Sequence, residues 1–503
     1  MDRATGTLHQ DWLAMSVPDR KQEPSAARRV AVVGGGITGL AAAHRLSELL
    51  PHGQTVLFEA TGRLGGVLET VNTSGFLIER SADSFITKFP WAVDLCRRVG
   101  LTPQLLPTHE SGRRAAVVRN GKLHRIPKGF LIMEPQQLWP ILTSSVLSPW
   151  GKLRLLAEPW VARKPTAEDN TALDESVASF ATRRLGREVF ERLVQPLLAG
   201  IYTADPQKLS MAATMPQFLE SEAQLGSLLR AQWDRKRNRK EDSQATPESG
   251  ARYGMFLAPA GGMGSLVEAI EKKLKVVTIR RGTAVERIEK QDSGQWRLAF
   301  STQPAAESFD AVILALPGPS ATRLLHKTNA DLANQFDKIE YASSVVVSTG
   351  FRRDQFCQPL DGFGFVVPQI EARRIIATSY ASEKFPGRAP SGYVLVRTFV
   401  GGALQPELVA QSEQDLIELV LQELSSLLGI RGDPQVVDVA RWDAAMPQYH
   451  VGHLDRVNRI EQQIANQPGL EIASNAFQGV GIPQCVHSGE QAAERVADWL
   501  CRS

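Results

Sequence analysis

The chain has 503 residues, of which 43% are hydrophobic and 22% charged, and its formal net charge at pH 7 is +3. These values are ordinary for a globular enzyme, so they exclude a low-complexity chain and a protein that binds nucleic acid through a strong positive charge. The length predicts two or three domains that share a large core. Because the four cysteines show no C-x-x-C spacing, we predict reduced thiols and no metal site.

Residues 1–27 are polar and lack the apolar core of a secretion signal, so we predict a disordered tail. No window of the sequence reaches the roughly 20 apolar residues of a membrane span. We therefore expect a cytoplasmic protein that rests on the inner face of the cell membrane at most.

Residues 29–46 form the first recognisable motif. A hydrophobic run leads into three spaced glycines and then into a helical pattern, which predicts a strand, a tight turn and a helix. Gly34 permits the turn, Gly36 leaves room for a pyrophosphate, and Gly39 lets the helix pack closely on the strand. The free amides at the start of the helix would then face the phosphates.

A second predicted strand, residues 55–58, ends in Glu59, about where an acid accepts hydrogen bonds from ribose hydroxyls. The two strands and the helix complete a βαβ unit that binds a dinucleotide. The next residues, 61–66, resemble the E-x-x-x-R-x-G-G continuation of the FAD-dependent amine oxidase and protoporphyrinogen oxidase superfamily. The resemblance implies that FAD is the cofactor and that Arg63 approaches its pyrophosphate. No second G-x-G-x-x-G follows, so we expect electrons to pass to oxygen or a quinone and expect no built-in NADPH domain.

The segment 80–88 resembles the G-[AP]-[DN]-S-F loop of protoporphyrinogen oxidases, with Ser81 in place of the family glycine. In the family, a basic residue near this loop faces a propionate of the substrate. Lys88 is the first candidate for this role and Arg80 the second. The alternative for Lys88 is an ordinary solvated lysine.

Residues 93–225 are predicted to be mostly helical, with a short hairpin around residues 120–121. Between residues 136 and 160 the sequence is rich in leucine and tryptophan, and it is interrupted by two prolines. Such helices either dock into a lipid interface or belong to the core, and both alternatives stay open.

Residues 196–210 resemble the P-x-x-x-G-[IV]-[YF]-x-[AG]-[DN]-x-x-x-L-S motif of protoporphyrinogen oxidases, which amine oxidases do not share in this form. The resemblance implies that the carbonyl of Gly200 meets the pyrrole nitrogens of the substrate. The alternative is a turn glycine between two helices. Residues 226–251, basic and then rich in small polar residues, are predicted to be a solvated loop.

The chain then returns to the cofactor, where Val285 is expected to reach the adenine through its backbone. Residues 318–437 are predicted to form a mainly antiparallel substrate domain. There Tyr380 belongs to a run that resembles the family's [FY]-S-S-x-x-F-P-x-R-A-P, in which the aromatic ring packs on the macrocycle; a tyrosine of the sheet core is the alternative. His450 and His453 are predicted to be structural.

The predicted fold is α/β: a Rossmann-like FAD-binding domain of the glutathione-reductase type (28–92, 252–317 and 438–503), an α+β substrate domain and a helical subdomain. The residues expected to bind the cofactor are Gly34, Gly36, Ile37, Thr38, Gly39, Glu59, Ala60, Arg63, Gly65, Gly66, Val285, Gly479, Val480, Gly481 and Ile482.

The resemblance implies oxidation of protoporphyrinogen IX by FAD and oxygen, with Gly200 at the reacting ring. Coproporphyrinogen III is the first alternative substrate, and a flavin-binding scaffold without turnover is a second alternative. The partners expected are the porphyrinogen, oxygen, a membrane surface and a second copy of the chain, as in the family; no nucleic acid is expected.

Overall fold

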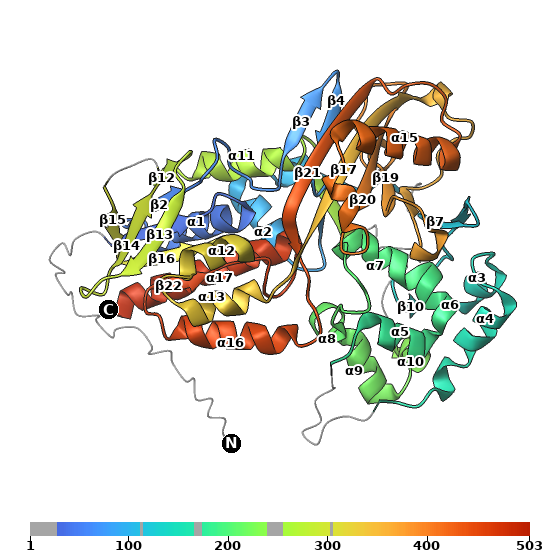
Figure 1. Ribbon diagram of the computed structural model, residues 1–503, viewed down its shortest axis with the longest axis horizontal. Helices are drawn as coiled ribbons and strands as arrows, with labels where there is room; N and C mark the ends of the chain where they lie inside the picture. The colour runs from blue at the N-terminus through green and yellow to red at the C-terminus, as the bar shows by residue number, and fades with distance from the viewer. Residues whose placement is uncertain (1–27, 111–113, 165–173, 239–254, 302–304, 503) are drawn as a thin grey trace, which may run out of the picture.

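A five-stranded parallel sheet forms one side of the computed structural model, which describes residues 28–502 without 111–113, 165–173, 239–254 and 302–304. Its strand order is β12-β2-β1-β16-β22 (Figure 1). The strands are β1 (Arg29–Val33), β2 (Gln54–Phe58), β12 (Val277–Arg280), β16 (Ala311–Leu314) and β22 (Leu470–Ile472). They read as near-continuous apolar runs because both faces of the sheet are covered, as is usual for parallel sheets. The tail predicted at residues 1–27 lies outside the described residues.

Two hydrophobic clusters cover the two faces of this sheet. On one face, alternate side chains of β1 and β2 pack with four helices, α1 (Ile37–Leu49), α2 (Trp91–Val99), α11 (Met263–Lys273) and α17 (Ile482–Arg502). The other face packs with α12 (Gly318–Leu325), α13 (Ala330–Asp337), α16 (His453–Ala465) and the small sheet of β13 (Val285–Lys290), β14 (Trp296–Phe300) and β15 (Glu307–Phe309). The predicted βαβ unit is therefore confirmed.

A seven-stranded sheet lies beside the first, at the upper right of Figure 1, with the order β21-β17-β20-β19-β18-β7-β8. Its pairs are antiparallel except for β18 with β7. The helix α15 (Glu413–Leu428) packs on one face through a cluster of valine, leucine and phenylalanine. The strands are β7 (Ala116–Arg119), β8 (Lys122–Arg125), β17 (Tyr341–Arg352), β18 (Gly364–Val366), β19 (Ala377–Tyr380), β20 (Tyr393–Gly401) and β21 (Val436–Pro447).

Two strand assignments differ from the predicted domain division. The hairpin of β7 and β8, predicted within the helical segment, joins the seven-stranded sheet through β18. The strand β21 begins before residue 438 and pairs with β17 along most of its length, so it belongs to the same sheet. Pairing of strands that are far apart in sequence leaves no local signal, which explains both differences.

Short helices occupy the lower right of Figure 1 and pack around their own hydrophobic cluster. Pro149 starts one of them, in agreement with its fixed backbone angle. The helices are α3 (Leu138–Thr143), α4 (Pro149–Leu156), α5 (Val177–Leu185), α6 (Arg187–Val189), α7 (Gln195–Tyr202), α8 (Met211–Thr214), α9 (Pro216–Leu225) and α10 (Leu228–Asn238).

The helix α10 corrects the first part of the loop predicted over residues 226–251, and residues 239–251 lie outside the described residues. Its start is stabilised by the buried carboxylate of Glu158, which accepts hydrogen bonds from the amides of Leu228 (2.9 Å) and Leu229 (3.2 Å). Both leucine side chains are buried. An acceptor 70 residues away in sequence thus satisfies the helix start, and the composition of residues 226–251 could not reveal it.

The remaining strands form small sheets. The hairpin of β3 (Thr70–Thr73) and β4 (Phe76–Glu79) packs on the seven-stranded sheet. A three-stranded sheet has the order β5-β11-β6, and β9 pairs with β10. The bounds are β5 (Phe85–Ile86), β6 (Leu105–Pro107), β9 (Phe130–Leu131), β10 (Glu134–Pro135) and β11 (Phe256–Pro259).

Candidate functional site

The turn between β1 and α1 contains two glycines that packing requires and one that borders open space. A Cβ at Gly39 would lie 1.9 Å from the carbonyl oxygen of Gly34, and a Cβ at Gly34, where φ is +110°, would lie 2.3 Å from that of Ala315. At Gly36 the nearest atom to a Cβ is the Cα of Gly66, at 4.0 Å. The turn lies at the carboxyl ends of β1 and β16, where parallel sheets bind nucleotides.

We call the open space beside Gly36, together with the cavity described below, the cofactor groove. Glu59 lies at one end of it. One carboxylate oxygen accepts from the Gly35 amide (2.8 Å) and the other from the Thr61 amide (2.8 Å). A cavity of about 390 Å³ lies beside it, and the residues that line this cavity include Gly34, Glu59, Ala60 and Val285. The structure therefore brings together four residues predicted to bind the cofactor, among them Glu59, expected at the ribose, and Val285, expected at the adenine.

The glycine pair at residues 65–66 lies against the same turn. The Gly65 amide donates to the Gly35 carbonyl (2.8 Å), and the guanidinium of Arg63 donates to the Gly66 carbonyl (2.6 Å). Arg63 also pairs with Glu69 at 3.3 Å. Arg63 thus lies beside bare backbone, where the resemblance expects a pyrophosphate.

The C-terminal helix α17 packs on α1, the helix that follows this turn. A Cβ at Gly489 in α17 would lie 2.1 Å from the carbonyl oxygen of Thr38 in α1, so the two helices touch through backbone. The Gly479 amide donates to the hydroxyl of Tyr449 (3.0 Å). The side-chain oxygens of Asn475 and Gln484 are buried and accept no hydrogen bond within the described residues. The single N–H of the oxidised ring of FAD would supply a donor to one of them.

Gly200 lies in the last turn of α7, facing the seven-stranded sheet. A Cβ there would make ordinary contacts, 3.8 Å from Val366 and 4.0 Å from Ala377. Carbonyls in a last helical turn have no partner within the helix, so that of Gly200 can accept from a ligand. Beside it, an apolar cluster on the sheet is formed by Ala199, Val366, Ile376, Ala377 and Phe399. A cavity of about 80 Å³ adjoins this cluster.

The two candidates for propionate binding lie in different settings. Arg80 is paired with Asp438 (3.1 Å) and Glu69 (3.3 Å), so its charge is already compensated. Lys88 is exposed, and its ammonium lies 5.1 Å from the ring centre of Phe89. The geometry therefore favours Lys88 over Arg80 as a residue that can meet a carboxylate.

Tyr380 does not lie with Gly200. Ala377 faces Gly200, and Tyr380, three residues further along the same strand, points to the opposite face. There it is 2% exposed, packs in the cluster under α15, and its ring centre lies 6.3 Å from that of Phe365. This placement favours the alternative, a tyrosine of the sheet core, over stacking on a substrate.

Arg397 is a residue that the sequence reasoning missed. It lies on β20 two residues before Phe399, so both side chains share the face that Gly200 approaches. Its side chain is 2% exposed and pairs with Asp83 at 3.3 Å. A charged residue in the otherwise apolar run 393–401 was the signal that could have identified it.

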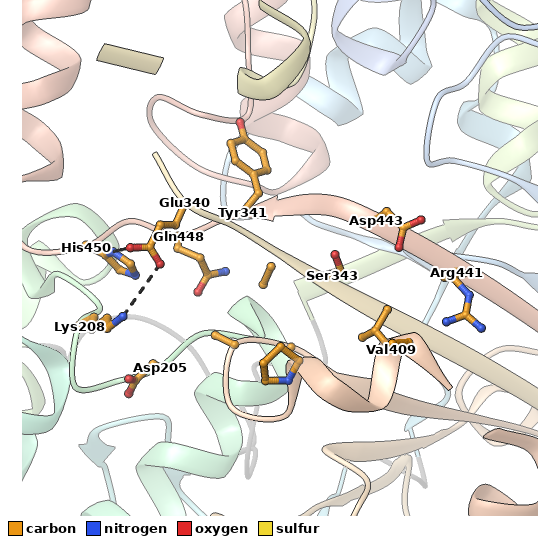
Figure 2. Close-up of a pocket in the computed structure, with 15 residues that line it drawn as sticks. Asp205, Lys208, Glu340, Tyr341, Ser343, Val409, Arg441, Asp443, Gln448 and His450 are labelled. Atoms are coloured by element: carbon orange, nitrogen blue, oxygen red, sulfur yellow. Dashed lines mark ion pairs between the residues drawn. The ribbon is translucent and has the colours of Figure 1, made fainter. Parts of the chain in front are cut away.

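Another cavity, of about 590 Å³, opens where β17 begins and β21 ends (Figure 2). Lys208 and His450 both face Glu340 there, at 4.0 and 3.8 Å. Burial lowers the pKa of His450, so its ring favours the neutral form. Both acidic and basic side chains line this cavity, so its charge selects no class of ligand. None of its lining residues also lines the cavity beside Glu59.

Comparison with known proteins places the whole chain among flavoproteins. The model of the flavin containing amine oxidoreductase family matches residues 37–497. Coproporphyrinogen III oxidase of Bacillus subtilis is 33% identical over 480 residues, which are 94% of this chain and 98% of the relative. The mitochondrial protoporphyrinogen oxidase of Nicotiana tabacum is 31% identical over 496 residues, 95% and 96% of the two chains. A crystal structure from Exiguobacterium sp. 255-15, provisionally named protoporphyrinogen oxidase, has a TM-score of 0.82 at 31% identity and covers 94% of this chain and 99% of its own.

Proposed function

The chain belongs to the flavin containing amine oxidoreductase family, and from this premise we propose that it uses FAD to oxidise a porphyrinogen to the corresponding porphyrin. One observation carries the proposal: the glycine turn between β1 and α1 leaves open space at Gly36 while α1 packs on the C-terminal helix α17 through backbone, and Gly200 lies in the last turn of α7 against an apolar cluster of the seven-stranded sheet. Relatives over nearly the full length are named for porphyrinogen oxidation.

The reaction removes six electrons and six hydrogens from the macrocycle. Bound FAD would supply the hydride acceptor, and three molecules of oxygen would take up the electrons and leave as hydrogen peroxide. The residues of the chain bind, orient and exclude water. The Gly200 carbonyl would accept a pyrrole N–H, and Lys88 would pair with a propionate. A tetrapyrrole is larger than the cavity of about 80 Å³, so this cavity alone would not hold the substrate.

Protoporphyrinogen IX is the substrate that the motifs favour, and coproporphyrinogen III is the second candidate. The relatives from Bacillus subtilis and Staphylococcus aureus, both 33% identical, are named for coproporphyrinogen III, and this observation supports the second candidate. The two substrates undergo the same chemistry and differ in the number of propionates, two against four. A site selective for the second would need additional cations at its rim.

The proposed activity is tested with purified protein and both porphyrinogens in air. Porphyrin fluorescence that grows with time, together with hydrogen peroxide in a 3:1 ratio to porphyrin, is the expected result, and the ratio of kcat/KM values identifies the substrate. A yellow protein that forms no porphyrin from either compound would support the alternative of a scaffold without turnover. A protein that cannot be loaded with FAD would overturn the proposal altogether.

A membrane surface is the proposed docking partner of the helical segment. Trp139 on α3, Trp150 on α4 and Trp160 just after it are 75–80% exposed, and indole rings favour the boundary between water and lipid. None of the described helices has the length and apolar character needed to cross a membrane.

Sedimentation with anionic vesicles tests this docking. We expect the protein to pellet with the vesicles, and the double variant Trp150→Ser/Trp160→Ser to lose most of this binding. Val276→Ser, at an exposed apolar residue beside the parallel sheet, is the matched control and should bind like the unaltered protein. Equal binding by all three proteins, or none by the unaltered protein, would contradict docking through these helices.

A further inference from the structure

We propose that Asp83, Lys384 and Arg397 form a buried ionic cluster that positions residues 80–84 between the cofactor groove and the substrate face, and so sets the geometry of hydride transfer. The cluster joins three segments that are far apart in sequence: the loop before β5, the short helix α14 (Ala381–Lys384) and the strand β20. The inference rests on the proposed function, because it assigns positioning residues to that reaction.

The cluster is closely packed and nearly closed to solvent. The ammonium of Lys384 lies 2.8 Å from the Asp83 carboxylate, and the guanidinium of Arg397 lies 3.3 Å from its other oxygen. The Asp83 and Lys384 side chains are each 12% exposed, and that of Arg397 is 2% exposed. Burial alone favours the neutral acid, but Lys384 and Arg397 outweigh it and hold the pKa of Asp83 well below its usual range. Asp83 therefore stays charged at neutral pH.

Through Arg397 the cluster reaches the backbone of the loop. The Arg397 guanidinium donates to the carbonyl of Ser81. Ser81 in turn donates from its hydroxyl to the carbonyl of Val67 (2.5 Å), and Val67 directly follows the glycine pair. The indole of Trp442 fixes the same loop by donating to the Arg80 carbonyl (2.7 Å). A chain of direct contacts thus leads from Arg397 to the backbone that borders the cofactor.

The other side of Arg397 contacts the substrate face. Its guanidinium carbon lies 5.4 Å from the ring centre of Phe399, within the range of a cation–π contact. Phe399 packs against the apolar cluster with Ala377, beside Gly200. One buried side chain therefore contacts both the loop at the cofactor and the surface at the substrate.

Loss of the Asp83 charge should disturb this arrangement strongly. Two cations would then lie together without a carboxylate in a space that excludes water, and they would move apart. Displacement of reacting groups by about 1 Å can cost two orders of magnitude in rate. Because no member of the cluster lies at the exposed Gly200 or Lys88, substrate affinity should change little.

The test compares Asp83→Asn with Lys384→Arg, which keeps the charge, and with Glu307→Gln. Glu307, on β15 of the small sheet, pairs with Arg29 of β1 (2.8 Å) and with Arg280 of β12, so its variant loses two ion pairs at a distance from the loop. For each holoenzyme we would measure the anaerobic rate of flavin reduction by porphyrinogen, KM, the visible flavin spectrum, the FAD dissociation constant and the Tm.

For Asp83→Asn we expect a fall of about tenfold or more in the reduction rate, a KM within about twofold, and an altered flavin spectrum. Lys384→Arg should keep most of the flavin-reduction rate of the unaltered protein. Glu307→Gln should lower Tm without slowing flavin reduction. An unchanged rate and spectrum in Asp83→Asn, or an equal rate loss in Glu307→Gln, would overturn the proposal.

Additional measurements cover a variant that does not fold and a protein without porphyrinogen oxidation. If Asp83→Asn does not fold, Lys384→Met, which leaves Asp83 paired with Arg397, is judged by the same criteria. If the unaltered protein oxidises neither porphyrinogen, the proposed function fails on its own. In that case the flavin spectrum and FAD dissociation constant of Asp83→Asn decide the role of the cluster, and values equal to those of the unaltered protein reject it.

Discussion

The cofactor groove and the substrate face are built by different means. The groove is bordered by backbone, with glycines that allow β1, α1 and α17 to approach within contact of one another. The substrate face is formed by side chains from α7, β19, β20 and the loop at residues 80–84. The comparison teaches that a nucleotide site can be encoded by where side chains are absent, whereas a site for a macrocycle depends on which side chains meet across the fold.

Glycine substitutions in the groove should break the first half of this comparison most severely. In Gly39→Ala the Cβ would overlap the carbonyl oxygen of Gly34, at 1.9 Å, and both atoms belong to rigid backbone. We expect the free energy of unfolding to fall by about 3 kcal/mol, measured by urea denaturation. Gly62→Ala is the control, because no atom lies within 4 Å of a Cβ there. Equal stability of the two variants would contradict the close packing of α1.

Acidification should also destabilise the fold at α16, where the His453 side chain is buried. Burial lowers the pKa of His453 from 6.5 to about 4, and its ring nitrogen lies 3.0 Å from the Phe477 carbonyl. The pKa of His453 is lower in the folded than in the unfolded chain. Between the two pKa values, the unfolded chain therefore binds a proton that the folded chain does not bind. The stability present above pH 6.5 should fall by about 3 kcal/mol as the pH drops toward 4.

This pH dependence is measured as the free energy of unfolding in urea between pH 7.5 and 4. His453→Gln should reduce the slope, since the titrating ring is removed. A variant with the same slope as the unaltered protein would assign the effect to other groups.

These differences explain what the sequence could predict. The motif at residues 29–46 is local, since Gly34, Gly36 and Gly39 lie within six residues, and the predicted strand, turn and helix are confirmed. That these glycines and the C-terminal glycines bind one cofactor stays a prediction. The cluster of Asp83 with Arg397 spans more than 300 residues of sequence, and no local pattern places the two together. Tyr380 shows the same limit, because a motif locates a residue on a strand without fixing the face to which its side chain points.

Gly36 allows the groove to be tested apart from the fold. A Cβ at Gly36 meets no atom closer than 4.0 Å, so Gly36→Val should fold with nearly unchanged stability without FAD. Its side chain would occupy the place expected for the pyrophosphate, and we predict an FAD dissociation constant raised by about tenfold or more. Flavin fluorescence titration measures this constant. An unchanged value would place the pyrophosphate elsewhere.

On the substrate face, Lys88→Glu should act on binding more than on chemistry. A negative charge would repel a propionate, so KM should rise by about fivefold to tenfold while kcat changes little. Lys122→Glu, at an exposed lysine of β8, is the control for the change in net charge. Equal KM and kcat values for the two variants would show that Lys88 is an ordinary solvated lysine that does not bind the propionate.

Gly200→Ala should have the smallest effect and sharpens the comparison with Gly39. An added Cβ meets Val366 and Ala377 at ordinary distances, 3.8 and 4.0 Å, and the carbonyl is retained. We expect a Tm unchanged within about 2 °C and a kcat reduced by no more than about threefold. A Tm loss comparable to that of Gly39→Ala would show that Gly200 serves packing.

The central claim is that the groove and the substrate face act together on one porphyrinogen. The most direct measurement is the visible spectrum of the FAD-loaded protein when porphyrinogen is added without oxygen. We predict that the flavin absorbance bleaches at once and returns when air is admitted, with porphyrin fluorescence in proportion. A flavin that stays oxidised in the presence of both porphyrinogens would contradict the account.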